Sequence, residues 1–288
     1  MPRPSVSFEF FPPKSLEASF RLWDCVNVLA PLAPDWVSVT YGAGGTTREL
    51  TREAVGALGQ NFDLRVAGHL TCVDATREET LAVARDFAKA GVRDIVALRG
   101  DPPKGVDGFT PHPDGFRSSV ELIAALKAED DFTIRVGCYP DTHPEAADAD
   151  ADIAWLKRKI DAGADEAITQ FFFDPETFLR FRDRCAKAGI SAPIVPGILP
   201  IEDWTKASRF ARACGAQIPA DLVAAFETAL RDDRADLLAI AQATELCDTL
   251  VEEGVEHLHF YTLNRPELTR DVCSALGLVP APALSEVA

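Results

Sequence analysis

Short apolar runs alternate along the chain with longer stretches of helical periodicity. Eight runs rich in β-branched and aromatic residues are predicted to form strands, at 6–11, 36–41, 65–72, 94–100, 133–139, 166–173, 193–199 and 257–263. Amphipathic helices are predicted at 16–30, 47–59, 76–90, 117–128, 144–162, 175–188, 203–213 with 219–252, and 267–276. Eight repeats in 288 residues average 36 residues each, which is the size of a strand–helix unit.

Helix start signals stand where the predicted strands end. Capping-box spacing occurs at Thr46 and Glu49, Thr76 and Glu79, Thr142 and Glu145, and Asn264 and Glu267, and Asp174 precedes Pro175 as a further N-cap. The predicted fold class is therefore α/β, a single-domain (β/α)8 TIM barrel over residues 1–278 with a flexible C-terminal tail at 279–288. A doubly wound open sheet is the alternative.

Strand alternation predicts which side chains enter the barrel, because residues i and i+2 share a face. Val6, Phe8 and Phe10 are expected to face the helices, as are Val96 and Leu98 in the fourth strand. The residues predicted to face inward or to end the strands are Ser7, Glu9, Ser38, Thr40, His69, Arg99, Asp101, Tyr139 and Gln170. Because most of them fall near the carboxyl ends of strands, where barrels build their active sites, they predict a small-molecule site. The structural alternative is a buried Glu9–Arg99 ion pair and a core histidine at His69.

Charge and cysteine usage narrow the class of protein. The net charge of −16 makes nucleic acid an unfavourable partner. No apolar run approaches the about 20 residues of a membrane span, and the amino terminus has no signal-peptide pattern, so a cytoplasmic protein is predicted. Seven scattered cysteines without a C-x-x-C pair indicate reduced thiols, and no metal site is expected. The basic run 157–159 is either solvated helix surface or a diphosphate clamp.

The segments at the predicted strand ends resemble the catalytic domain of the methylenetetrahydrofolate reductase family, in its bacterial form. They are 7–14 (SFEFFPPK), 37–43 (VSVTYGA), 69–72 (HLTC), 97–101 (ALRGD), 139–146 (YPDTHPEA), 157–164 (KRKIDAGA), 168–174 (ITQFFFD), 196–200 (PGILP) and 259–265 (HFYTLNR). They follow the family order nearly from end to end. A barrel is also the family's fold.

The resemblance implies a flavoenzyme of one-carbon metabolism. FAD would be reduced by NADH or NADPH and reoxidised by 5,10-methylenetetrahydrofolate in a ping-pong reaction, and the product 5-methyltetrahydrofolate would supply methyl groups for methionine synthesis. Glu9 matches the family's general acid, which protonates the leaving folate nitrogen. Its neighbours Phe8, Phe10 and Phe11 suggest an apolar setting that raises the carboxyl pKa. We also expect a homo-oligomer, and no regulation by S-adenosylmethionine because the sequence ends after the barrel.

Further positions take their roles from the resemblance alone. Asp101 matches a catalytic aspartate that contacts flavin and folate. Gln170, Phe210 and Arg265 match substrate contacts, and Thr40 a nicotinamide-nucleotide contact. The flavin positions are Tyr41, Ala43, His69, Arg99, Gly100, Asp101, Tyr139, His143, Ala146, Asp152, Arg158 and Lys159. Lys206 and Trp155 depart from the family pattern, where relatives carry glutamine and asparagine. A flavin-free reductase and a non-enzymatic folate- or flavin-binding module are the alternatives.

Overall fold

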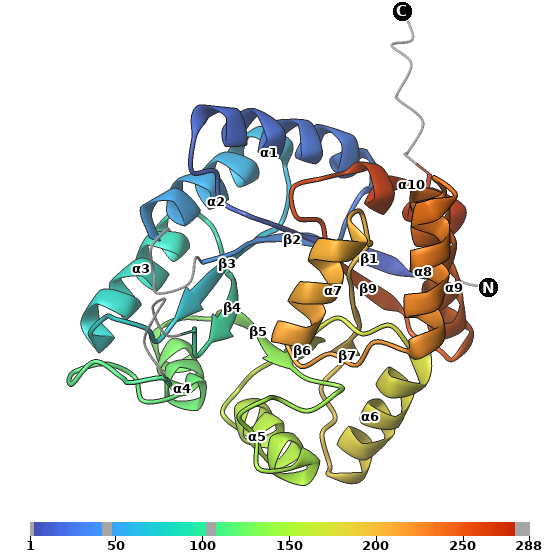
Figure 1. Ribbon diagram of the computed structural model, residues 1–288. Coiled ribbons are helices and arrows are strands. Elements are labelled where there is room, and N and C mark those ends of the chain that lie inside the picture. The colour runs from blue at the N-terminus through green and yellow to red at the C-terminus, as the bar shows by residue number, and fades with distance from the viewer. Residues whose placement is uncertain (1–2, 42–47, 102–107, 280–288) are drawn as a thin grey trace, which may run out of the picture.

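Parallel strands form a nearly closed barrel inside a ring of helices (Figure 1). The computed structural model describes residues 3–41, 48–101 and 108–279. The strands are β1 (Ser5–Phe10), β2 (Trp36–Val39), β3 (Val66–Thr71), β4 (Asp94–Leu98), β5 (Thr133–Cys138), β6 (Glu166–Thr169), β7 (Ile194–Val195), β8 (Gly197–Ile198) and β9 (His257–Tyr261). Their hydrogen-bonded order is β7-β6-β5-β4-β3-β2-β1-β9-β8. The predicted barrel is confirmed, and the open sheet is wrong.

The predicted seventh strand is divided into β7 and β8 by Pro196, which has no N–H to give to a ladder. β7 pairs with β6, whereas β8 pairs with β9. The carbonyl of Pro196 accepts from the backbone N–H of His259 at 3.0 Å. The two halves of one strand therefore complete the ring between β6 and β9.

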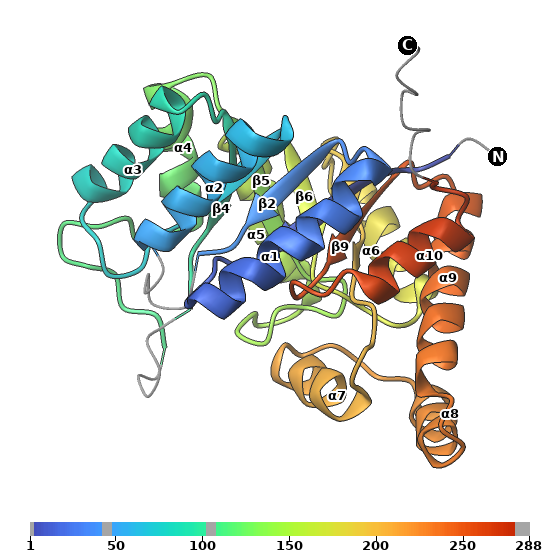
Figure 2. The same ribbon diagram turned by 90° about the horizontal axis from the view of Figure 1, so that it is seen from above.

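The helices follow the strands around the barrel. They are α1 (Leu16–Leu29), α2 (Arg48–Phe62), α3 (Arg77–Lys89), α4 (Ser119–Glu129), α5 (Ala149–Asp161), α6 (Pro175–Lys187), α7 (Trp204–Ala213), α8 (Ala220–Arg231), α9 (Ala235–Glu252) and α10 (Glu267–Ala275), with a 3-10 turn at Ala30–Leu32. Figure 2 shows α7 and α8 standing away from this ring, on the side of the barrel that faces the viewer in Figure 1. None of the helices in the described ranges has the length and apolar character to cross a membrane.

The predicted caps have mixed outcomes. Thr76 and Glu79 form a reciprocal capping box, and Asp174 caps α6 before Pro175. The Thr142 cap is wrong, because α5 begins later, at a cap by Asp148. The Asn264 cap is also wrong: Pro266 precedes α10, and the Asn264 amide instead bonds the backbone N–H and C=O of Phe11 at 2.8 and 2.9 Å. Thr46 and the tail from residue 280 lie outside the described residues.

Each strand has one face toward the helices and one toward the barrel axis. Phe8 and Phe10 pack in the main core, as predicted. The phase of β4 is the reverse of the prediction, since Ile95 and Ala97 join that core whereas Val96 packs inside with Trp36. The run from 95 to 98 is apolar on both faces, so alternation could not give its phase.

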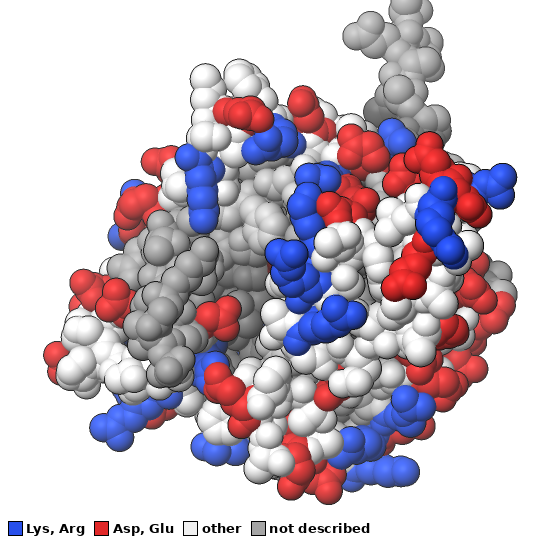
Figure 3. Space-filling view, viewed as in Figure 1, with Lys and Arg blue, Asp and Glu red and all other residues white. Residues whose placement is uncertain are grey.

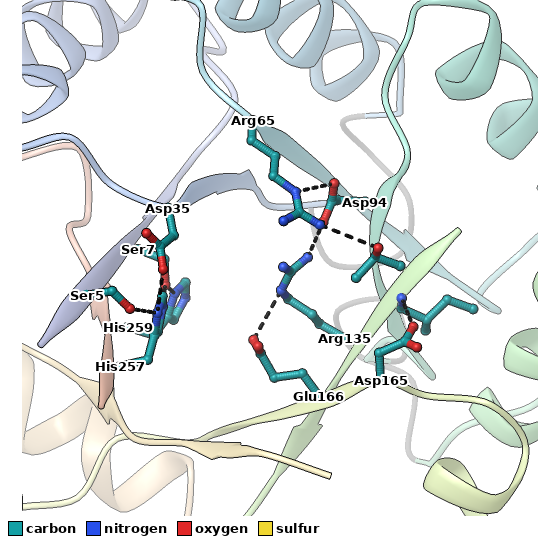
Figure 4. A network of polar contacts seen from close by, with 12 residues as sticks. Ser5, Ser7, Asp35, Arg65, Asp94, Arg135, Asp165, Glu166, His257 and His259 are labelled. Carbon is teal, nitrogen blue, oxygen red and sulfur yellow. Dashed lines mark hydrogen bonds and ion pairs between the residues drawn. The ribbon is translucent and has the colours of Figure 1, made fainter. Parts of the chain in front are cut away.

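The amino end of the barrel interior contains a layer of charged side chains (Figure 4). Arg135 donates to Asp94 at 2.6 Å and to Glu166 at 3.1 Å, and Arg65 donates to both oxygens of Asp94 at 2.7 and 2.9 Å. The Arg135 guanidinium also lies 4.1 Å from the ring centre of Trp36. Each buried charge here has a partner, so these side chains stabilise the barrel and offer no free charge to a ligand.

Candidate functional site

A cavity of about 430 Å³ opens at the carboxyl ends of β4 and β5. Eight predicted cofactor positions line it: Arg99, Gly100, Asp101, Tyr139, His143, Ala146, Asp152 and Lys159. Trp155 and Glu145 complete its polar and aromatic wall. Figure 3 shows this face hollowed at its centre, with Lys and Arg side chains gathered beside the hollow over α7, which carries Lys206, Arg209 and Arg212. Positions predicted from separate segments therefore converge on one cavity.

The wall formed by the loop after β5 is held by its own hydrogen bonds. The backbone N–H of His143 donates to Asp152 at 2.8 Å, and the ring Nδ1 of His143 accepts from the N–H of Glu145 at 3.0 Å. The Tyr139 and His143 rings meet edge to face at 4.5 Å. Burial raises the pKa of Tyr139 to about 12, so its hydroxyl keeps its proton. The loop thus fixes two rings at the mouth of the cavity.

The three cations of the basic run 157–159 point in different directions. Lys157 pairs with Asp161 one turn along α5 at 2.8 Å, and Arg158 lies 4.5 Å from the Trp155 ring centre on the exposed side. Lys159 alone lines the cavity, where its ammonium donates to the carbonyl of Gly137 at 2.7 Å. Burial lowers the Lys159 pKa. The run is therefore not one clamp, and Lys159 is its member suited to an anionic ligand.

Arg99 is oriented by an acid that the sequence did not single out. Its guanidinium forms a two-pronged ion pair with Glu145, one N–H···O distance being 3.1 Å. The pair holds the Glu145 pKa below its usual range. The expected alternative, a Glu9–Arg99 pair, is wrong, because no hydrogen bond or ion pair joins these two described residues.

Glu9 lies inside the barrel between two imidazoles. Its Oε2 is 3.4 Å from Nε2 of His69 and 3.8 Å from Nε2 of His259, and its side chain is 17% exposed. Burial raises the Glu9 pKa, and His69 opposes that rise only in part. The direction expected from sequence is right, but its reason is wrong, because Phe8 and Phe10 lie on the opposite face of β1. Glu9 can thus hold a proton where a carboxyl normally would not.

The other predicted substrate positions are spread around the mouth. Phe210 of α7 is 47% exposed, with its ring 5.3 Å from that of Phe171. Arg265 donates to Glu202 at 2.8 Å, and Gln170 accepts from the N–H of Phe171 at 3.0 Å. These side chains make local contacts and do not line the cavity.

Two further nucleotide positions, Thr40 and Tyr41, directly follow β2. Thr40 is fixed through its backbone, which bonds Phe10 and the Thr51 hydroxyl. Tyr41 is buried in the main core. Ala43 lies outside the described residues.

His259 is the neighbour of Glu9 that sequence reasoning did not select. The run 257–261 (HLHFY) alternates, so the signal was present: it places His257, His259 and Tyr261 on the barrel face of β9. The Nε2 atoms of His69 and His259 are buried without a hydrogen-bond partner in the described ranges. Both of these atoms face Glu9.

Comparison with known proteins shows the family of this chain. A family model described as methylenetetrahydrofolate reductase matches residues 2–277. The chain is 45% identical to the 5,10-methylenetetrahydrofolate reductases of Salmonella typhimurium and Escherichia coli, covering 96% of this chain and 92% of each relative. It is 36% identical to methylenetetrahydrofolate reductase (NADH) 1 of Arabidopsis thaliana, covering 98% of this chain and 50% of that relative.

The fold is similar to that of solved structures with little sequence identity. One is an uncharacterised protein from Clostridium thermocellum that binds two copies of 5-methyl-5,6,7,8-tetrahydrofolic acid, with a TM-score of 0.60, 14% identity and 96% coverage of both chains. This likeness concerns the fold alone. By its end-to-end family match and its identity to the bacterial enzymes, the chain belongs to the methylenetetrahydrofolate reductase family.

Proposed function

We propose that this protein reduces 5,10-methylenetetrahydrofolate to 5-methyltetrahydrofolate, with NADH or NADPH as reductant and FAD as cofactor, in a ping-pong reaction. The observation that carries the proposal is the convergence of eight predicted cofactor positions on one cavity. Its opening lies at the carboxyl end of the barrel, where barrel enzymes bind their substrates. Family membership supports the reaction type.

The chemistry of the cavity wall fits a flavin nucleotide. Lys159 supplies a buried ammonium whose one hydrogen bond among the described residues goes to a carbonyl, so it has donors left for phosphate oxygens. Arg99 adds a second cation, and the Tyr139 and Trp155 rings supply flat surfaces. When bound, FAD would accept a hydride from the nicotinamide and later give it to the folate carbon.

Gly100 lets this wall of the cavity pack closely against the end of β3. Its φ of +85° is a conformation that other residues adopt at a cost, and a Cβ would lie 2.6 Å from Val73 and 2.9 Å from Thr71. Asp101 follows directly at the mouth of the cavity. Its carboxylate would disfavour a neighbouring negative charge and so favour release of hydride from a reduced flavin.

Glu9 would supply the proton that opens the folate ring. As the bond between the methylene carbon and the leaving nitrogen breaks, the Glu9 O–H gives its proton to that nitrogen and becomes a carboxylate. The cation left on the carbon side then receives the hydride. Gln170, Phe210 and Arg265 would hold the folate at the mouth, and Thr40 would contact the nicotinamide nucleotide.

The visible spectrum of the purified protein tests this proposal. We expect FAD to copurify, its absorbance to bleach with NADH under anaerobic conditions, and the colour to return with 5,10-methylenetetrahydrofolate. A colourless protein that oxidises NADH with the folate directly would make it a flavin-free reductase. A protein that binds either ligand without turnover would be a binding module.

A further inference from the structure

We propose that Ser7, His257 and His259 form a proton path along the barrel, which returns a proton to Glu9 from the amino end. The inference rests on the proposed role of Glu9 as an acid that must be reloaded in each cycle. It assigns a function to buried polar side chains that no cofactor or substrate role uses.

The path consists of short contacts between neighbouring strands (Figure 4). Ser5 Oγ lies 2.6 Å from Nδ1 of His257, and Nε2 of His257 lies 2.8 Å from Oγ of Ser7. Ser7 Oγ lies 2.7 Å from Nδ1 of His259. The path then reaches Glu9, whose Oε2 is 3.8 Å from Nε2 of His259.

The last contact is about 0.6 Å beyond hydrogen-bond range and is the step that must close. A small rotation of the Glu9 side chain can close it, since catalytic hydrogen bonds are often long before ligands bind. The buried Nε2 of His259 has no other hydrogen-bond partner among the described residues. Its N–H therefore gains a partner when Glu9 turns toward it.

One set of tautomers makes every proton point toward Glu9. If both imidazoles carry their proton on Nε2, His257 donates to Ser7, Ser7 donates to Nδ1 of His259, and His259 directs its N–H at Glu9. Trp36 stacks on both rings, at 6.0 Å from His257 and 4.9 Å from His259 between centroids. This stacking fixes the ring planes, so the rings cannot turn away from the path.

The surroundings keep the path neutral at rest. Burial lowers the pKa of His259 to about 3, assisted by Arg135 from β5, and that of His257 to about 4, with His259 and Arg135 lowering it and Asp35 opposing. Two further titratable side chains are near the Glu9 carboxyl: His69 of β3 and Tyr261 of β9. A proton therefore passes through the imidazoles without being stored on them.

The two ends of the path differ in their access to water. Ser7 and His259 are fully buried, whereas the Asp35 carboxylate, 3.4 Å from Nδ1 of His257, is 56% exposed at the amino end. Flavin and folate bound at the mouth would cover the part of Glu9 that is exposed there. The amino end then remains open as a source of protons.

The transfer balances as a relay of single protons. Water gives a proton to the Ser5 hydroxyl, which passes its own proton to Nδ1 of His257. His257 passes its Nε2 proton to Ser7, Ser7 passes its proton to Nδ1 of His259, and His259 passes its Nε2 proton to the Glu9 carboxylate. One proton leaves solvent and one carboxyl is formed. Once product has left and the mouth is open, the same hops in reverse restore both starting tautomers: Glu9 passes a proton to Nε2 of His259 and takes one from water at the mouth, and Nδ1 of His257 releases one to solvent at the amino end.

Ser7→Ala tests the path, and Ser38→Ala is its matched control. Ser38 is the register partner of Glu9 on β2, fully buried, and its Oγ has no hydrogen-bond partner among the described residues. Both changes remove one buried hydroxyl at a similar depth, but only Ser7 lies in the path. Ser7→Thr keeps the hydroxyl and serves as the rescue variant, and melting temperature checks that each variant folds.

The first readout is proton uptake, followed with a pH-indicator dye while reduced protein is mixed with 5,10-methylenetetrahydrofolate. In wild type and Ser38→Ala we expect uptake to keep pace with flavin reoxidation. In Ser7→Ala the first reoxidation should keep its rate, because Glu9 starts protonated, whereas uptake should lag by about tenfold or more. Uptake that stays in step in Ser7→Ala, or lags equally in Ser38→Ala, overturns the path.

The second readout does not require turnover. Nitrogen NMR of the imidazoles should find both His257 and His259 protonated on Nε2 in the wild type, and a changed His259 tautomer in Ser7→Ala alone. Protonation of His259 on Nδ1 in the wild type contradicts the path. Failure of the proposed function looks different: Glu9→Gln would then reduce folate at the wild-type rate, whatever Ser7→Ala does.

Discussion

At the amino end of the barrel Arg135 is enclosed between Asp94 and Glu166. At the carboxyl end, among the described residues, Lys159 has one hydrogen-bond partner, a carbonyl, and the Glu9 carboxyl faces two imidazoles without a hydrogen bond. Both ends are rich in charged side chains, but it is at the carboxyl end that the described charged groups keep hydrogen-bonding capacity for a ligand. A buried charge with its partners satisfied holds structure together, while unused donors and a raised carboxyl pKa are typical of a ligand site. The difference separates the structural end of this barrel from its reactive end.

The largest effect is expected from Glu9→Gln at the reactive end. Only the folate half-reaction needs a proton from Glu9, so its rate should fall about 10²–10⁴-fold while reduction of the flavin by nicotinamide is kept. Rapid-mixing measurements of each half-reaction provide the check. Equal slowing of both halves would count against the acid role.

At the amino end of the barrel, Arg135→Met should lower the stability of the fold. It removes the cation between Asp94 and Glu166, which are both largely buried. Asp94 then keeps Arg65 alone, and Glu166 loses its ion-pair partner. We expect a loss of about 3–5 kcal/mol in the free energy of unfolding, measured by denaturant titration. Arg270→Met, which removes an exposed cation beside Asp271, is the control and should change stability by less than about 1 kcal/mol. If Arg135→Met lowers the free energy of unfolding no more than Arg270→Met does, Arg135 has no structural role.

Lys159→Met should weaken FAD retention, because Lys159 is the member of its basic run that lines the cavity. Lys157→Met is the matched control, since Lys157 pairs with Asp161 away from the cavity. Charge-assisted hydrogen bonds contribute about 1.5–3 kcal/mol, so affinity should fall by roughly tenfold or more in Lys159→Met alone. Equilibrium dialysis against FAD measures both, and equal losses would show that only the helix charge matters.

Asp101→Asn should have a smaller and selective effect. Loss of the carboxylate at the cavity mouth should raise the flavin reduction potential and slow folate reduction more than reduction by NADH. Redox titration and the two half-reaction rates measure this. An unchanged potential would remove Asp101 from flavin tuning.

An effect of pH on stability is expected at His259. Its pKa is lowered from 6.5 to about 3 in the folded protein, so the unfolded chain binds the extra proton first as the pH falls. Stability is therefore complete above pH 6.5 and is lost as the pH falls from there toward about 3. Denaturant titrations over this range should show that the free energy of unfolding depends less on pH in His259→Gln than in the wild type. An unchanged dependence on pH would contradict the lowered pKa of His259.

Much of the fold was readable from periodicity, because barrel strands and helices differ in their hydrophobic spacing. The phase of β4 was not, since Ile95, Val96, Ala97 and Leu98 are apolar on both faces. A predicted helix cap was wrong where the residue instead forms hydrogen bonds to another segment, as Asn264 does to the backbone of Phe11. Local spacing does not reveal such tertiary competition.

For the site, sequence gave candidate residues but not their partners. The strand-end rule found Arg99 and Glu9, yet the pairing of Arg99 with Glu145 and of Glu9 with His69 and His259 depends on how loops and strands meet in space. The strand-end rule does not reveal the charged layer of Asp94 and Glu166, because both residues begin strands and lie at the opposite end of the barrel. The strand-end rule also found Asp101, and its predicted role, like that of Lys159, comes from the family resemblance.

A crossed comparison of Glu9→Gln and Arg135→Met tests the separation of the two ends most directly. The rate of the folate half-reaction is measured for both variants at a temperature at which both are folded, beside their melting temperatures. The account predicts that Glu9→Gln loses the rate and keeps the melting temperature, while Arg135→Met loses melting temperature and keeps the rate. If both properties fall together in either variant, the two ends of the barrel do not have separate roles.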